Sequence, residues 1–274
     1  MLKDITLGQY YPGRSAIHRL DPRVKLMGTL VFILTLFLFG SLSSYMVATA
    51  VLGSVIFLSK VPLRFMLKGL KTIFILMLIT ALFNLFLTPG TVILRLWKLT
   101  ITEEGVKMAF YMAVRLTYLI LGSSVMTLTT TPNQLTDGLE TGLRGLKKIH
   151  VPVHEIAMMM SIALRFIPIL MDETDKIMRA QEARGADFHS GSVFRRAKAL
   201  IPLLVPLFIS AFRRANDLAM AMEARGYRGG DGRTRMNPLI YRSSDRIAYV
   251  IIAAYAVLMC MAKFWIRIRL PAFV

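Results

Sequence analysis

Cysteine is almost absent from this sequence of 274 residues, and its scarcity limits the available chemistry. The one cysteine, Cys260, lies inside an apolar run, which excludes an intrachain disulfide and a thiolate metal cluster and suits a small core residue. The four histidines are scattered, and Pro152 interrupts the closest pair, His150 and His154. This spacing does not favour a histidine metal site, so we expect neither a metal nor another cofactor.

Acidic residues are also scarce, since 16 Asp and Glu accompany 34 Lys and Arg and give a formal net charge of +18. Hydrophobic residues make up 55% of the chain and charged residues 18%, with a mean hydropathy of +0.56. Such a composition excludes an ordinary soluble domain, a disordered chain and a nucleic-acid-binding protein. We predict an all-α polytopic membrane protein.

Long uncharged stretches predict about five membrane-spanning helices. Residues 26–59 carry no charge, and their 34 residues would form a helix about 51 Å long, against about 30 Å of hydrocarbon. Gly40 and the serines after it predict a tight turn between two short spans. The five predicted spans lie near residues 26–40, 45–59, 72–94 (interrupted by Pro89 and Gly90), 108–129 and 247–266.

The distribution of lysine and arginine predicts the orientation of these spans. Basic residues flank residues 26–59 on both sides and are absent from the central turn, so the N-terminus is expected in the cytoplasm. Residues 1–25 lack a signal-peptide layout, so the mature protein is expected to start at Met1.

The same rule divides the chain into three parts. Residues 1–129 would hold four spans, 130–246 a cytoplasmic region, and 247–274 a last span that ends outside. Lys263, Arg267 and Arg269 are positively charged, which favours the cytoplasmic side. The side of the membrane on which the C-terminus lies is therefore undecided.

A repeated tetrapeptide is the most informative pattern in the cytoplasmic region. Glu-Ala-Arg-Gly occupies residues 182–185 and, 41 positions later, residues 223–226. Seven residues before each arginine lies an aliphatic side chain, Ile177 or Leu218, about 20° from the arginine's face on a helix. We predict two related amphipathic helices with related tips, beneath or along the membrane, because the apolar run at 156–164 is too short to cross it.

Each tip also has a purely structural explanation. Glycine after a helix end and arginine in its last turn are ordinary capping residues. Capping does not require the same tetrapeptide twice, so the repetition indicates a pair of similar or identical partners, each with an acidic groove. The candidate docking residues are Ala183, Arg184, Gly185, Ala224, Arg225 and Gly226.

Two other functions are left open by these observations. Residues 142–148 lack the spacing of a phosphate-binding loop, so the chain is not expected to bind ATP itself. Asp172, Glu173 and Asp175 could chelate magnesium as in membrane prenyl transferases, but three acids beginning a helix also complement its dipole. A stand-alone permease would need polar groups in the spans, where Arg115 and Asn84 stand out.

Several of these segments resemble the T component, the membrane-embedded coupling subunit, of bacterial energy-coupling factor transporters. Residues 11–25, YPGRSAIHRLDPRVK, are similar to the start of that family. Residues 164–188 and 201–227 are similar to its two coupling segments, each with an Ala-Arg-Gly signature.

The resemblance implies a non-catalytic subunit of the bacterial cell membrane. By position, Arg184 and Arg225 would dock into two ABC-type ATPase subunits, and a separate substrate-binding S component would rest on the apolar face of the coupling helices. That importer would take up a vitamin or metal that the S component selects. The candidates for the S-component contact, each of which could also pack within the protein, are Met158, Met159, Met160, Leu203, Leu204, Leu207 and Phe208.

Overall fold

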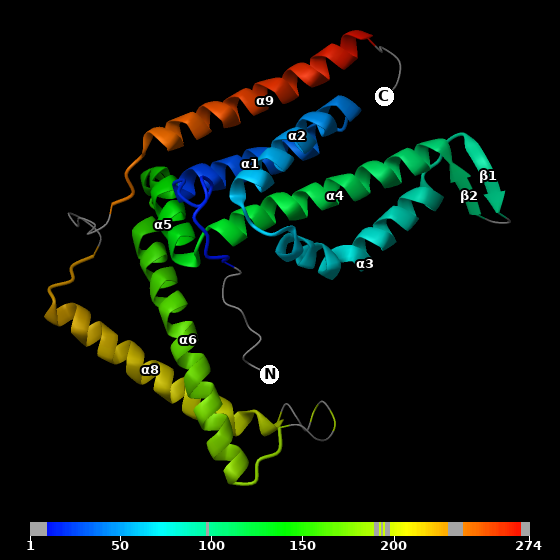
Figure 1. Cartoon of the computed structure of the whole chain (residues 1–274). Coiled ribbons are helices and arrows are strands. Elements are labelled where there is room, and N and C mark those ends of the chain that lie inside the picture. The colour runs from blue at the N-terminus through cyan, green and yellow to red at the C-terminus, as the bar shows by residue number, and fades with distance from the viewer. Residues whose placement is uncertain are drawn as a thin grey trace. The chain divides into compact units, whose positions relative to one another are not determined.

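The computed structural model forms two compact units (Figure 1). The bundle unit comprises Gly8–Gly138 and Leu239–Val274, and the crossing unit comprises Met1–Leu7 and Leu139–Pro238. The structure describes residues 10–96, 99–188, 192, 194, 198–229 and 238–269. Within these residues the chain is helical except for turns, loops and one short β-hairpin, which confirms the predicted all-α membrane class.

Five long helices make up the bundle unit. They are α1 (Pro22–Leu38), α2 (Leu42–Ser59), α3 (Leu63–Leu87), α4 (Glu103–Thr129) and α9 (Ser243–Arg269). Between α3 and α4 lies the antiparallel hairpin of β1 (Val92–Leu96) and β2 (Leu99–Thr102), and α5 (Pro132–Gly142) follows α4. Local sequence sets the helix starts: Asp21 caps α1 ahead of Pro22, and the Thr102 hydroxyl accepts the Gly105 N–H at the start of α4.

The crossing unit contains α6 (Val153–Ala183) and α8 (Ile201–Ala224), preceded by the 3₁₀ helix η2 (Leu143–Ile149). Both long helices continue through an internal proline, Pro168 in α6 and Pro206 in α8. Their amphipathic character fits the predicted pair of related helices.

Two apolar clusters form the core of the bundle unit. The larger one joins α1, α2 and α9 through Phe32, Leu36, Ala48, Tyr255 and Met259, among others. The smaller one packs the end of α2 and the start of α3 against the end of α4, through Val61, Met66, Val125 and Leu128. The helices of the bundle therefore pack on each other through a few buried apolar side chains on each helix.

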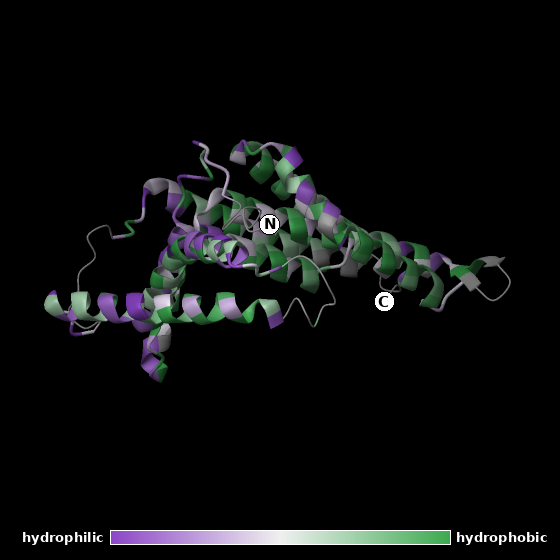
Figure 2. Ribbon diagram, turned by 90° about the horizontal axis from the view of Figure 1, so that it is seen from below, coloured by the Kyte–Doolittle hydropathy of each residue, from purple (hydrophilic) through white to green (hydrophobic). Residues whose placement is uncertain are grey.

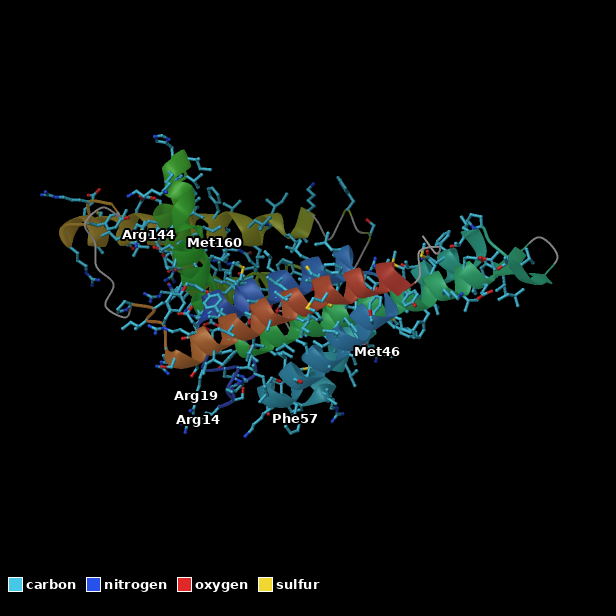
Figure 3. All side chains as sticks on the ribbon, turned by 90° about the horizontal axis from the view of Figure 1, so that it is seen from above. Arg14, Arg19, Met46, Phe57, Arg144 and Met160 are labelled. Carbon is cyan, nitrogen blue, oxygen red and sulfur yellow. The ribbon has the colours of Figure 1, made fainter. Side chains whose placement is uncertain are left out.

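The outward faces of the bundle helices are apolar as well. Phe57 and Met46 on α2 are 85% and 65% exposed and project away from the ribbon (Figure 3). Colouring by hydropathy shows apolar residues distributed around these helices (Figure 2). Apolar side chains on both inner and outer faces are typical of helices surrounded by lipid.

Several span boundaries differ from the predicted ones. The turn between α1 and α2 lies at Gly40 as predicted, but α3 begins at Leu63, well before residue 72, because its basic first turns are compatible with a helix. Residues 92–94, predicted inside a span, belong to β1, since α3 ends at Leu87 ahead of Pro89 and Gly90.

Among the residues that the structure describes, length and composition single out four helices that could cross a bilayer. These are α2, α4, α6 and residues 243–262 of α9, and the bent α3 would make a fifth. The apolar run at residues 156–164 was predicted to be too short to cross the membrane, but it belongs to α6, whose 31 residues continue past Arg165 and Pro168 and are long enough to cross. Helix α1, with 17 residues, lies at the lower limit of the length that crosses a bilayer.

A polar cluster, which we call the N-terminal clasp, joins the start of α1 to the start of α9. It consists of Asp21, Arg23, Lys25, Tyr241 and Asp245. Arg23 donates to both carboxylate oxygens of Asp21 at 2.9 and 2.8 Å, and its guanidinium lies 3.8 Å from the Tyr241 ring centroid. Asp245, 1% exposed, accepts the Asp21 N–H at 2.8 Å.

The clasp also reaches the end of α4. Lys25 is buried and donates to the backbone carbonyl of Thr129 at 2.8 Å, while the Tyr11 N–H donates to the carbonyl of Leu128. Burial raises the pKa of Asp21, but the hydrogen bonds and charge of Arg23 lower it more, so the net pKa lies below its usual value. The segment 11–25 thus ties three helix ends to the same side of the bundle.

Asp245→Asn tests the clasp. Both Asp245 oxygens accept backbone N–H groups, from Asp21 and Arg242, and an amide can satisfy only one of them. We expect the free energy of unfolding to fall by about 1–3 kcal/mol. Thermal unfolding in detergent measures this, with the exposed Asp172→Asn as control. Equal melting temperatures for the two variants would contradict the role assigned to Asp245.

Candidate functional site

The two signature tripeptides end α6 and α8 in the same backbone conformation. Arg184 and Arg225 are the C-cap residues, with φ near −90° and ψ near 10° in both. The glycines that follow, Gly185 and Gly226, have φ of 87° and 69°, in the left-handed region that favours glycine. The repeated sequence therefore produces a repeated structure.

Both tips have the two hydrogen bonds of a Schellman motif. At the α6 tip, the N–H of Ala186 donates to the carbonyl of Gln181 and that of Gly185 to the carbonyl of Glu182, each at 2.9 Å. At the α8 tip, the corresponding donors are Tyr227 and Gly226, at 3.0 and 2.8 Å. Capping thus accounts for the glycine in each signature, but the motif needs no arginine.

The arginines face solvent at both tips. All six candidate docking residues are exposed. Within the described part of the chain, neither the Arg184 nor the Arg225 side chain has a hydrogen-bond or ion-pair partner. Arg23, by contrast, is held on several sides in the clasp. Two guanidinium groups at helix ends are thus available to acceptors outside the chain.

Helices α6 and α8 cross within the crossing unit (Figure 1). The Gln181 side chain near the end of α6 donates to the carbonyl of Pro202 at the start of α8, at 3.4 Å. Arg184 therefore lies near one end of α8 and Arg225 at the other. With 24 residues, α8 spaces these ends by about 36 Å.

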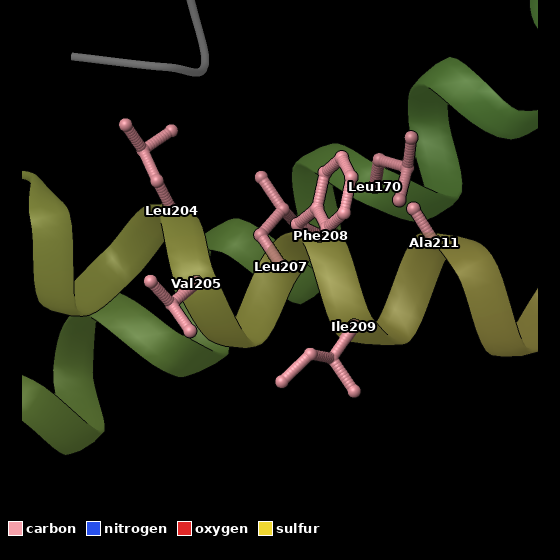
Figure 4. A pocket seen from close by; sticks show the side chains of 7 residues that line it. All are labelled: Leu170, Leu204, Val205, Leu207, Phe208, Ile209 and Ala211. Carbon is pink, nitrogen blue, oxygen red and sulfur yellow. The ribbon is translucent and has the colours of Figure 1, made fainter.

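An apolar groove of about 610 Å³ lies along the crossing (Figure 4). It is lined by Leu170 from α6 and by Leu204, Val205, Leu207, Phe208, Ile209 and Ala211 from α8. The lining offers no polar side chain, so the groove can recognise a partner through shape and apolar contact alone.

The predicted S-component contact residues fall into three groups. Leu204, Leu207 and Phe208 line the groove, whereas Leu203 is only 7% exposed and does not line it. Met158, Met159 and Met160 lie on α6 outside the groove, and the last two are exposed.

Four groove residues were not predicted: Leu170, Val205, Ile209 and Ala211. A signal for two of them exists, because Leu170 and Ala211 are related by the same offset of 41 residues as the signatures.

The acidic cluster is placed differently from the prediction. Asp172, Glu173 and Asp175 lie in the middle of α6, not at the start of a helix, because α6 already begins at Val153. They therefore do not complement a helix N-terminus, and Glu173 instead pairs with Arg214 of α8 at 3.3 Å. In the part of the chain described, no three His, Cys, Asp or Glu side chains form a possible metal site.

The two polar residues noted in the spans have partners within the bundle unit. Arg115 on α4 donates from Nε to the Tyr45 hydroxyl on α2 at 3.2 Å, and Asn84 donates to the Thr80 carbonyl one turn earlier in α3. These hydrogen bonds give both side chains a role in packing between or within helices.

Comparison with known proteins gives matches along nearly the whole chain. A family model described as cobalt transport protein, CbiQ, matches residues 13–236. The energy-coupling factor transporter transmembrane protein EcfT of Clostridium kluyveri is 54% identical, over 97% of this chain and 99% of its own length. The EcfT proteins of Thermosediminibacter oceani and Bacillus subtilis are 51% and 46% identical, over 96% and 94% of this chain and 99% and 98% of their own.

Substitution of the tip glycines separates capping from docking. Gly185→Ala and Gly226→Ala place a Cβ at positive φ without any steric neighbour within 4 Å, so each should cost roughly 1–2 kcal/mol of local stability. Hydrogen exchange should show faster exchange at the amides of Ala186 and Tyr227 in the isolated chain. Gly142→Ala, also in open space, is the control. Unchanged protection at both amides would contradict the capping role.

Proposed function

The chain belongs to the CbiQ/EcfT family of energy-coupling factor transporter transmembrane subunits, and we propose that it transmits ATP-driven motion to a substrate-binding membrane subunit of the same importer. The resemblance to the T component is confirmed by these relatives. As a member of this family, the chain is a multi-pass transporter subunit of the cell membrane.

The observation that carries the proposal is the pair of solvent-facing arginines on identically capped helix ends. A structural cap would not need them, and nothing in the described chain occupies them. Their spacing of about 36 Å along α8 suits two separate binding sites better than one shared pocket.

Two ABC-type ATPase subunits are the proposed partners of these arginines. Each would present a groove with carboxylates to Arg184 or Arg225 and space for the small residues beside it. A charge-assisted hydrogen bond of this kind contributes about 1.5–3 kcal/mol, enough for a tether when packing supports it. ATP hydrolysis would take place on these partners, and the chain itself would not be an enzyme.

The groove between α6 and α8 is the proposed seat of the substrate-binding S component. Leu204, Leu207 and Phe208 are its central candidates, and the flexible side chains of Met158, Met159 and Met160 would extend the contact along α6. The S component would select the vitamin or metal that is taken up.

The mechanism we propose follows from the geometry of the crossing unit. ATP binding would draw the two ATPases together and move Arg184 and Arg225 with them. Because α6 and α8 are packed on each other, the displacement would reach the groove and reorient the bound S component. Residues 130–246 and the N-terminus would face the cytoplasm, with spans in residues 1–129 and 247–274.

The magnesium-dependent transferase is not favoured as an alternative. One of its three acids, Glu173, already pairs with a cation of α8 and is therefore less available to a metal. The permease alternative would depend on Arg115 and Asn84, and both already have protein partners.

Replacing both arginines tests the docking proposal. Arg184→Ala with Arg225→Ala should weaken ATPase association by roughly 10- to 150-fold per lost arginine contact, while the chain stays inserted in the membrane. Co-purification and ATP-driven uptake in vesicles measure this. Arg179→Ala and Arg213→Ala, exposed arginines on the same two helices, are matched controls. Normal uptake by the double variant would refute the docking model.

A charge in the groove tests the S-component contact. Phe208→Glu would place a carboxylate in an apolar lining and should abolish co-purification of the S component while the ATPases remain bound. Ile149→Glu, an equally exposed apolar position on η2, is the control. Retention of the S component by Phe208→Glu would exclude the groove as its seat.

A further inference from the structure

An ion pair connects the two crossing helices near their midpoints. The Glu173 carboxylate of α6 lies 3.3 Å from the Arg214 guanidinium of α8, with side chains 26% and 41% exposed. Arg214 belongs to the same stripe of α8 as Leu207, Ala211 and Leu218, all shielded from solvent to some extent. Its Nε is buried and has no hydrogen-bond acceptor in the described chain, so Glu173 is the acceptor that compensates this cation.

The two members of this pair occupy equivalent positions of the repeat. Glu173 and Arg214 are 41 residues apart, the same offset that relates Arg184 to Arg225 and Ile177 to Leu218. When two similar elements pack about a twofold axis, contacts are reciprocal, and a residue that touches its own equivalent lies on the axis. The Glu173–Arg214 contact joins equivalent positions, as it would if a local pseudo-twofold axis of the crossing passed through it.

The charges at this axis differ between the two copies. Two identical helices would place like charges opposite each other there, whereas α6 supplies an acid and α8 a base. Like charges facing each other disfavour a pairing, so this pattern favours α6 against α8 over either helix against itself.

We infer that Glu173 and Arg214 are positioning residues that fix the point at which α6 and α8 cross, and so set the separation of the two arginine tips. This inference rests on the proposed function for its effect on uptake, but its effect on the helices does not depend on any partner. It also assigns a role to the acidic cluster of α6, part of which faces α8 in this pair. Gln181, which contacts Pro202, lies eight residues further along α6 and supports the crossing away from the axis.

Charge reversal with rescue tests the inference. Glu173→Arg and Arg214→Glu would each place like charges at the axis, and the double variant would restore an opposite pair. Spin labels on Ala180→Cys and Ala221→Cys, exposed equivalent positions outside the signatures, report the tip separation when Cys260 is replaced by serine. Asp172→Arg, one residue along and exposed, is the matched control for a reversed charge on α6.

In the full-length chain, each single reversal should shift or broaden the distance distribution between the labels, and the double variant should restore it. In the assembled transporter, ATP-driven uptake should fall roughly tenfold with each single reversal and return to within about threefold in the double variant. Asp172→Arg should change neither measurement. If a single reversal prevents folding, the milder Glu173→Gln and the rescue by the double variant decide the outcome.

Unchanged distances in the single reversals, or a double variant no better than the singles, would overturn the inference. Restored distances without restored uptake would overturn the link between this pair and transport. The variant lacking both tip arginines should keep the parental distance distribution. Failure of the docking proposal would therefore appear as normal uptake by that variant, and failure of this inference as unchanged distances in the single reversals.

Discussion

The contact between α6 and α8 is the constraint on which the functional region depends. Taken singly, each is a long amphipathic helix whose apolar stripe has no partner within the helix itself. Packed across each other, they bury part of those stripes, leave the rest as one apolar groove, and place two identical caps at opposite ends of α8. The groove and the tips are thus products of the same crossing, and a change in it would alter both together.

In the bundle unit, charged groups lie close to apolar helices and need partners there. The N-terminal clasp concentrates Asp21, Arg23 and Asp245 at the helix starts and compensates each charge with a partner or backbone groups. Between the helix ends, packing is carried by Phe, Leu, Tyr and small residues. The polar contacts of the clasp determine which helix ends meet. The apolar side chains between the helix ends can face lipid.

The sequence predicted features that depend on local chemistry. The turn at Gly40, the capped tips and the helical character of residues 201–224 follow from glycine, spacing and periodicity within a few residues. Span boundaries were less predictable, because charges such as Arg64 and Lys68 suggest a membrane surface without ending a helix. The length of α6 was misjudged for the same reason, since Arg165 interrupts the apolar run but not the backbone hydrogen bonds.

Contacts between distant residues could not be predicted at all from local pattern. The burial of Lys25 and Asp245 and the pairing of Glu173 with Arg214 depend on which helices pack together.

The left-handed glycine after each signature arginine also determines how a load would enter the helix. At Gly185 and Gly226 the backbone turns out of the helical path immediately after the cap, so the following chain does not extend the rod. A force that the proposed partner applied there along the helix axis would be resisted by the ladder of backbone hydrogen bonds. A force across the axis would instead bend the helix, which long helices do more easily.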